Sequence, residues 1–475
     1  MIGGGTGQSG SVLSSRPGVA ASFSSLRLPD YRKLWWAGTF SFMSVQMQFL
    51  LRGVLAWDLT EREGALGLVY LCFGAAMLVS TPFGGVAADR LPKRRVLLVS
   101  QGAILVAAVF MGVMVVTDLV QFWMLLLAAL TQGVAFGFYG PTRLAFTSEI
   151  VGREQLGNAI TLAMLSMNGT RVFAPSAAGA LAGLAFVGIG GAYLVSAAFS
   201  LGSFVLLMRC PAGNAPRSTS TAKPLAEIID GVRYVRARPR LRRLVVSSFL
   251  VIMFGFNYVA FVPALVKGEF GLGDGWVGLM MSASSIGAVF VAVPLAGRAD
   301  GAGVWRLMVV SGVVFGAGVI VFGLAPVFFL AFAVIVFVGA GTTGYQSMSN
   351  SIALNMTDDT HQGRVQSLMM LSFAGFGIAA APLGLLAEVI GLRSAIVLMG
   401  AVTLTTVTVY AALERDVQVE IEQGVLVPSS GPHRPTSVPE PHRPAHAHRP
   451  ARPSGVSLRP GVSPAPGGPQ TPRRT

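Results

Sequence analysis

Charged side chains inside long apolar stretches are the residues of this sequence with the most evident chemistry. Apart from groups near the predicted helix ends, only Arg52 and Arg171 lie within such stretches. A charge inside a membrane is costly and is usually kept for binding, transport or a specific partner. Arg171 could therefore face a watery cavity and attract an anionic or polar substrate. It could equally brace the helices by pairing with Asn168, whereas Arg52 could snorkel to the nearer surface.

Acidic groups do not accompany these arginines. Asp58 and Glu388 lie toward the ends of their apolar stretches, and no carboxylate lies at the depth of Arg171. This distribution weakens a simple mechanism in which a mid-membrane carboxylate carries a proton.

A polar loop at residues 85–95, Gly-Val-Ala-Ala-Asp-Arg-Leu-Pro-Lys-Arg-Arg, is the second candidate site. Asp89 at a helix end can join a charge relay with nearby arginines, and Gly85 lets its helix pack closely against the eleventh helix. Such a latch can bias one of two packings of the protein. The usual excess of basic residues in cytoplasmic loops explains the arginines, but it does not explain the glycine and aspartate at this spacing.

The loop at residues 141–158 adds charges of both signs, which could form ion pairs in one state only or remain solvated. The gating residues predicted from both loops and from the second half are Gly85, Asp89, Arg90, Lys93, Arg94, Arg143, Glu149, Arg153 and Arg364.

Polar side chains within several apolar stretches predict a cavity, because each of them would be expensive in contact with lipid. Hydrogen bonding between helices is the alternative for any one of them. The predicted cavity residues are Gln46, Gln48, Arg52, Gln132, Tyr139, Asn168, Arg171, Asn257, Tyr258, Tyr345, Gln346 and Asn350. Helix kinks are predicted at Pro175 and Pro382, since proline breaks a backbone hydrogen bond.

The elements that must position these residues are membrane helices. Of the 475 residues, 53% are hydrophobic and 12% are charged, about half the charged fraction of a soluble domain. A spanning helix needs about 20 mostly apolar residues. Twelve stretches qualify: 34–59, 64–88, 96–116, 121–146, 156–184, 186–208, 244–266, 275–297, 305–324, 327–350, 366–389 and 393–412. The fold class is therefore all-α integral membrane, with twelve transmembrane helices.

These stretches divide the chain into two groups of six. The predicted organisation is a disordered N-terminus (1–33), a first bundle (34–208), a linker (209–243), a second bundle (244–413) and a disordered tail rich in Pro, His and Arg (414–475). Apolar residues at helical spacing predict an amphipathic helix in the linker. Predicted inside segments before residue 414 carry 22 Lys and Arg and outside loops carry three, which puts both termini in the cytoplasm.

The two halves repeat each other. Met164-Leu165-Ser166 recurs as Met370-Leu371-Ser372, an offset of 206 residues, and residues 82–85 recur in degraded form at 294–297, an offset of 212. Two separate segments with nearly the same period indicate duplication. Parallel six-helix repeats around a central site are a transporter architecture, so we expect two pseudo-symmetric six-helix bundles.

The 85–95 loop resembles the signature loop of the major facilitator superfamily, with Pro92 where that family usually has glycine. The 141–158 loop, the segment around Arg364 and residues 52–60 are similar to the enterobactin-exporter-like branch known as transmembrane secretion effectors. The resemblance covers about residues 26–413. It implies the major facilitator fold, efflux, and coupling to an ion gradient, with proton antiport as the expected form.

The resulting expectation is a secondary active transporter that exports a small molecule, such as a drug-like compound, siderophore or other metabolite, by alternating access. The alternatives are an uptake or lipid-translocating permease of the same fold and a non-transporting membrane sensor. No catalytic triad, metal cluster or phosphate loop is apparent, so we expect no enzyme, metal or cofactor. The net charge of +14 follows the predicted topology, so nucleic acid is not an expected partner. A monomer in the cell membrane is expected.

Overall fold

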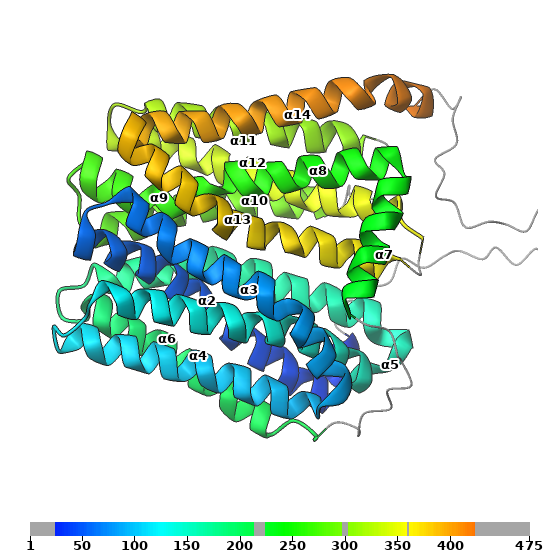
Figure 1. The fold of residues 1–475 in the computed structure, drawn as a ribbon, viewed down its shortest axis with the longest axis horizontal. Helices are drawn as coiled ribbons and strands as arrows, with labels where there is room; N and C mark the ends of the chain where they lie inside the picture. Colours follow the sequence, from blue (N-terminus) through cyan, green and yellow to red (C-terminus); the bar gives the residue numbers. More distant parts are fainter. Residues whose placement is uncertain (1–23, 213–223, 297–302, 359–360, 423–475) are drawn as a thin grey trace, which may run out of the picture. The chain divides into compact units, whose positions relative to one another are not determined.

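The computed structural model describes residues 24–212, 224–296, 303–358 and 361–422. Contact clustering separates residues 1–430 from 431–475, and the second unit lies outside the described residues. No strand occurs in the described part, so the predicted all-helical class is confirmed (Figure 1). Within these residues, nine helices are long and apolar enough to cross a membrane. The sequence predicts disorder for 1–33 and 414–475. Residues 29–33 and 414–422 are instead helical, whereas 1–23 and 423–475 lie outside the described residues.

The helices follow the twelve predicted stretches with several differences in their bounds. Chain order is η1 (Ser24–Arg27), α2 (Pro29–Thr60), α3 (Glu63–Arg90), α4 (Lys93–Val116), α5 (Phe122–Ala182), α6 (Gly188–Met208), α7 (Pro224–Ala237), α8 (Pro239–Phe254), η2 (Gly255–Asn257), α9 (Tyr258–Ala264), η3 (Leu265–Glu269), α10 (Asp274–Ala296), α11 (Val304–Leu324), α12 (Phe328–Asn355), α13 (Gln362–Ile390) and α14 (Leu392–Glu422).

Several predicted helix ends are wrong. The first helix starts at Pro29, because proline suits a first helical turn, and the last extends to Glu422. The fourth and fifth stretches are the two parts of α5, and they meet at a kink where Gly152 has a non-helical backbone (φ 71°), so the predicted division into two helices is confirmed. Pro175 and Pro382 lie inside α5 and α13. The seventh stretch lies in one uninterrupted helical span, Pro239–Glu269, in which a 3-10 turn (η2) and a π-helical turn (η3) flank α9.

Contacts sort the long helices into two sets. In the first set, α2 packs on α5 and α6, α4 packs on the same two helices, and α3 packs on α5. In the second set, α11 packs on α12 and α14, and α10 packs on α12. The second set also includes α8, which packs on α13 and α14, and η3, which contacts α9 and α10. The two sets meet along two seams, α3 against α13 and α5 against α10. In Figure 1 the first set is blue to cyan and the second is green to orange.

The helix ends define two ends of this unit. At the Lys267 end, α2 and η3 finish and α3 and α10 begin; Asp58, Arg62, Lys267, Asp274 and Glu388 lie there. At the opposite end, the α7 end, α3 finishes and α4 begins, and the linker helix α7 crosses the other helices (Figure 1).

Candidate functional site

Arg171 meets the second helix set through Gln346. The Arg171 Nη1 group of α5 donates a hydrogen bond of 3.2 Å to Oε1 of Gln346 in α12. Nε2 of Gln346 is buried and has no hydrogen-bond partner among the described residues. The Gln346 amide therefore accepts from Arg171 of the first set and carries a second, buried donor without a described partner. Asn168, the predicted neighbour of Arg171, has a side chain outside the described residues.

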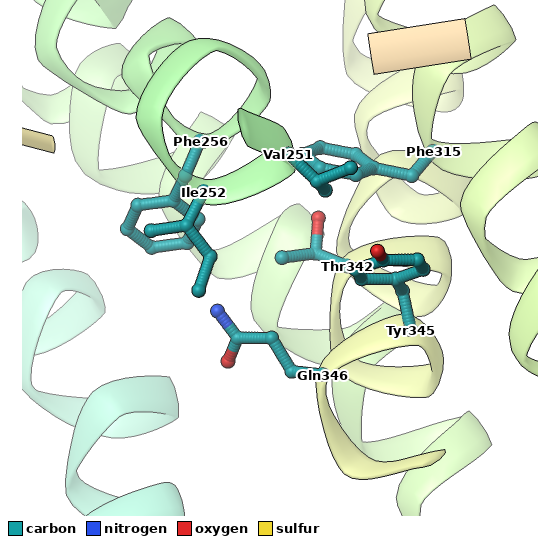
Figure 2. A pocket seen from close by; sticks show the side chains of 7 residues that line it. All are labelled: Val251, Ile252, Phe256, Phe315, Thr342, Tyr345 and Gln346. Atoms are coloured by element: carbon teal, nitrogen blue, oxygen red, sulfur yellow. The ribbon is translucent and has the colours of Figure 1, made fainter. Parts of the chain in front are cut away.

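Gln346 also lines a small apolar pocket of the second set (Figure 2). The lining residues are Val251, Ile252, Phe256, Phe315, Thr342, Tyr345 and Gln346. The gaps between them leave no room for a water molecule, whereas ligand pockets usually occupy about 300–1,000 Å³. The pocket is therefore collapsed in this conformation and needs a rearrangement to admit a substrate.

Aromatic rings join the two sets beside this pocket. Phe49 of α2 packs with Tyr70 of α3, with ring centroids 4.6 Å apart, and both contact Phe376 of α13 at 5.8 and 5.7 Å. Phe376 in turn contacts the pocket residue Phe256 at 5.7 Å. The space between the sets is therefore lined with flat aromatic surfaces as well as polar groups.

Arg52 is held inside the first set and does not snorkel. Its side chain is buried, Nε donates to the Gln48 carbonyl at 3.2 Å, and Nη2 donates to Oε1 of Gln132. Nε2 of Gln132 donates to Oε1 of Gln48 at 3.2 Å. Hydrogen bonds within the set thus hold Nε and Nη2 in place of a route to the surface, while the buried Nη1 has no partner among the described residues. The predicted snorkelling is wrong, because these amides lie within reach of the guanidinium.

This network continues deeper into the same set. Gln48 donates to Ser44, Ser44 contacts Ser200 at 3.1 Å, and Gln101 donates to Ser200 at 2.9 Å. The sequence reasoning missed Gln101 and Ser200, although polar residues inside apolar stretches were available as a signal. The network braces α2, α4, α5 and α6 against one another.

The predicted polar residues of the second set also bond mostly within their set. Tyr345 pairs with Ser247 at 3.0 Å, Tyr258 pairs with Ser284 at 3.3 Å, and Asn257 donates to the Phe376 carbonyl at 3.1 Å. Tyr139 in the first set is buried, and its hydroxyl has no partner in the described part of the chain. Gln46 and Asn350 are half-buried. Arg171 and Gln346 are the predicted cavity residues that form a described hydrogen bond from one set to the other.

Ion pairs join the two sets at the Lys267 end. Lys267 of η3 bridges Asp58 of α2 and Asp274 of α10, and the side chains of Lys267, Asp58 and Asp274 are 18%, 28% and 21% exposed. Arg62 pairs with Glu388 at 3.2 Å, and the backbone N–H of Gly64 donates to the same carboxylate at 3.1 Å. No sequence motif marks these pairs, because their members lie on segments far apart in the chain.

Close backbone contacts seal both seams near this end. A methyl group on Gly74 would lie 2.8 Å from the Cα of Gly377, and one on Gly179 would overlap the Cα of Gly278. Only glycine allows such an approach between helix backbones. Together with the ion pairs, these seams close the Lys267 end.

The predicted gating residues at the α7 end contact their own set. Lys93 pairs with Glu149 at 3.0 Å, and the Arg143 guanidinium lies 5.2 Å from the Phe42 ring centroid. Arg94 donates to the carbonyl of Met208. Ion pairs at this end therefore brace the first set internally.

Gly85 and Asp89 differ from the expectation. A methyl group on Gly85 would meet nothing within 4 Å, so this glycine does not pack against α13 in the conformation described. Asp89 and Arg90 are exposed, and Asp89 makes no ion pair with the described residues. The expected relay is absent from the described contacts. The Arg153 side chain lies outside the described residues.

The linker helix α7 is tied to the second set. Arg364 of α13 pairs with Asp230 at 2.5 Å, and Gly231 lies against the same arginine. Arg238 pairs with Asp358 at 2.8 Å. The apolar face predicted for this helix is only partly packed: Val235 is buried, while Ile229 is exposed.

Asp358 is the best-connected acid of this linkage. The Tyr234 hydroxyl donates to its carboxylate at 3.0 Å, and the ring of Tyr234 stacks on His361 with centroids 4.1 Å apart. The hydrogen bond from Tyr234 and the nearby Arg238 hold the pKa of Asp358 below its ordinary value of 3.8.

Residues 20–434 match a family described as transmembrane secretion effector. The chain belongs to this family. The match spans both helix sets, so the resemblance to this branch of the major facilitator superfamily is confirmed.

Curated relatives carry the name enterobactin exporter EntS. Those from Shigella boydii serotype 18 and Escherichia coli O127:H6 are each 28% identical over 373 residues, which cover 75% of this chain and 85% of the relative. Relatives of this kind are transporters. The comparison therefore supports a membrane transporter rather than an enzyme.

Solved transporters share the fold. A bacterial Spinster homologue in an inward-facing and occupied conformation matches with a TM-score of 0.67 and 14% identity, covering 82% of this chain and 97% of that one. The nucleoside transporter NupG matches with a TM-score of 0.63 and 13% identity, covering 80% and 98%. The chain is thus a multi-pass membrane protein with a major facilitator transporter fold.

Proposed function

We propose that this protein exports a small molecule by alternating access, with the substrate between the two helix sets at Arg171 and Gln346. One observation carries the proposal, namely that the two ends differ in how the sets are joined. At the Lys267 end, ion pairs and glycine seams join the sets. At the α7 end, the described ion pair of Lys93 lies within the first set, and that of Arg364 ties the second set to the linker. The exporter names of the relatives support outward transport.

The described ion pairs fit two alternative packings of the sets. To open the Lys267 end, Asp58 must leave Lys267 and Arg62 must leave Glu388, whereas the networks inside each set can stay intact. Packed interfaces of this kind switch between discrete arrangements rather than deforming continuously. The two sets therefore act as rigid bundles that rock around the central site.

The distribution of basic residues orients this motion. If the α7 end lies in the cytoplasm, as the positive residues of the predicted inside loops favour, the conformation described is closed toward the outside. Substrate then enters from the cytoplasm. Proton antiport supplies the energy, as the family resemblance implies.

Inside-out vesicles containing the protein test this function. On imposition of a pH gradient, they should accumulate a fluorescent dye or a siderophore supplied outside, and Asp89→Asn should slow the accumulation greatly. Because Asp89 is exposed and makes no described ion pair, the variant should keep wild-type thermal stability. Gradient-driven loss of preloaded substrate would instead identify an uptake permease, and transfer of a labelled lipid between leaflets would identify a lipid translocator. Unchanged transport in Asp89→Asn would rule out its gating role.

A further inference from the structure

The charged side chains inside the apolar stretches are arginines. Residues 156–182 of the fifth stretch, residues 239–264 and residues 328–355 contain no Asp or Glu. Of the two interior arginines, Arg52 is enclosed by Gln48 and Gln132 within the first set. Arg171 is the one that reaches a residue of the other set.

The contact at Arg171 is built from neutral and donor groups. The acceptor of its described hydrogen bond is the Oε1 atom of Gln346, which is a neutral amide. On the same side chain, the buried Nε2 donor has no partner in the described part of the protein. A ligand oxygen that displaced this amide contact would accept from both side chains. Hydrogen bonds between an ionised acceptor and arginine are roughly twice as strong as neutral ones.

The surroundings of these donors are apolar and aromatic. Phe256, Phe315 and Ile252 form the wall beside Gln346 in Figure 2. Through Phe376 this wall continues to Phe49 of the first set. Once the sets separate, these rings offer flat surfaces on which an aromatic or apolar body can stack.

We infer that the substrate is an organic anion with an aromatic or apolar body, whose acidic oxygen is bound by Arg171 and Gln346. This inference rests on the proposed transport function and names the substrate class of its central site. An organic cation would lie beside Arg171 with no carboxylate on the surrounding stretches to offset the repulsion.

Two xanthene dyes of opposite charge provide matched probes. Carboxyfluorescein and rhodamine 6G share a ring system, and their binding to the purified protein can be followed by fluorescence anisotropy. Arg171→Gln should raise the Kd of carboxyfluorescein at least tenfold, while Arg171→Lys, which keeps the charge, should change it far less. Arg95→Gln is the control, since it removes the same charge from an exposed position at the α7 end.

Each outcome decides the inference. Tighter binding of rhodamine 6G than of carboxyfluorescein, binding of neither dye, or equal effects of Arg171→Gln and Arg95→Gln would overturn it. Size-exclusion profiles of the variants identify any loss of fold. If Arg171→Gln does not fold, the dye affinities of Arg171→Lys and the wild type are compared instead. Vesicle transport separates the two proposals. Gradient-driven transport of the cation, unaffected at Arg171, would refute the substrate class and leave export standing. Arg171-dependent anion binding without transport would refute export alone.

Discussion

Removing the charge of Asp58 tests whether the Lys267 bridge holds the two sets together. In Asp58→Asn, Lys267 loses its partner in the first set but keeps Asp274 in its own set. The side chains of Asp58 and Lys267 are 28% and 18% exposed, so their pair lies between the surface and buried regimes and contributes about 1–2 kcal/mol. That loss should lower the ratio of closed to open populations at this end by about 5- to 30-fold.

Spin labels at Leu119 and Val327 can report these populations. Both residues are exposed, at 60% and 54%, and both follow helices that finish at the Lys267 end. With Cys72 and Cys210 replaced, double electron–electron resonance should show a longer distance gaining weight in Asp58→Asn. High salt should also give the longer distance more weight in the wild type, because ions screen the partly exposed pair. The difference between the wild type and Asp58→Asn should therefore shrink.

A matched control removes an ion pair that does not join the sets. Glu269 pairs with Arg393 at 2.8 Å, and both belong to the second set at the same end. Glu269→Gln should leave the distance distribution unchanged. An unshifted distribution in Asp58→Asn, or an equal shift in both variants, would refute the assignment of Lys267 as a strut between the sets.

Three further predictions address the seams, the buried network and the linker. Gly278→Leu should keep the α5–α10 seam from closing, at a cost of about 1–3 kcal/mol, and should reduce vesicle transport to background; normal transport would show that the seam tolerates a side chain. Gln132→Leu should destabilise the protein by about 1–3 kcal/mol, because Arg52 loses a buried acceptor. Its thermal midpoint in detergent should fall more than that of Gln46→Leu, in which the replaced side chain is only half-buried. Equal midpoints would contradict the role of the Arg52 network in bracing the first set. Asp358→Asn should lower the thermal midpoint of unfolding below that of the wild type at neutral pH, and the two midpoints should coincide in acid. The depressed pKa of Asp358 means that its contacts stabilise the fold above its unfolded pKa, and that this stability is lost as the pH falls through the folded value. A difference that persists in acid would contradict this pKa assignment.

Local patterns were sufficient for much of the fold. Apolar runs of about 20 residues predicted where the long helices lie, since a membrane span must satisfy its backbone hydrogen bonds within itself. The spacing of Gly85, Asp89 and Lys93 identified the superfamily, and the matching residues of the two halves predicted two related sets. Boundaries were less accurate: the first helix begins at Pro29 rather than at residue 34, and the last reaches Glu422 rather than residue 412.

Contacts between distant segments were decided only by the tertiary structure. Arg52 and Arg171 look alike in the sequence, as single cations in apolar helices. Packing places one among amides of its own set and the other against Gln346 of the opposite set. The sequence likewise does not predict the ion pair between Lys267 and Asp58. A charge at a helix end finds its partner only once the packing brings two helix ends together. Composition and periodicity therefore determined that this protein spans a membrane as paired helical bundles. The side of each helix that faces the other set, and hence which polar groups can open, close or bind, depended on how the helices pack.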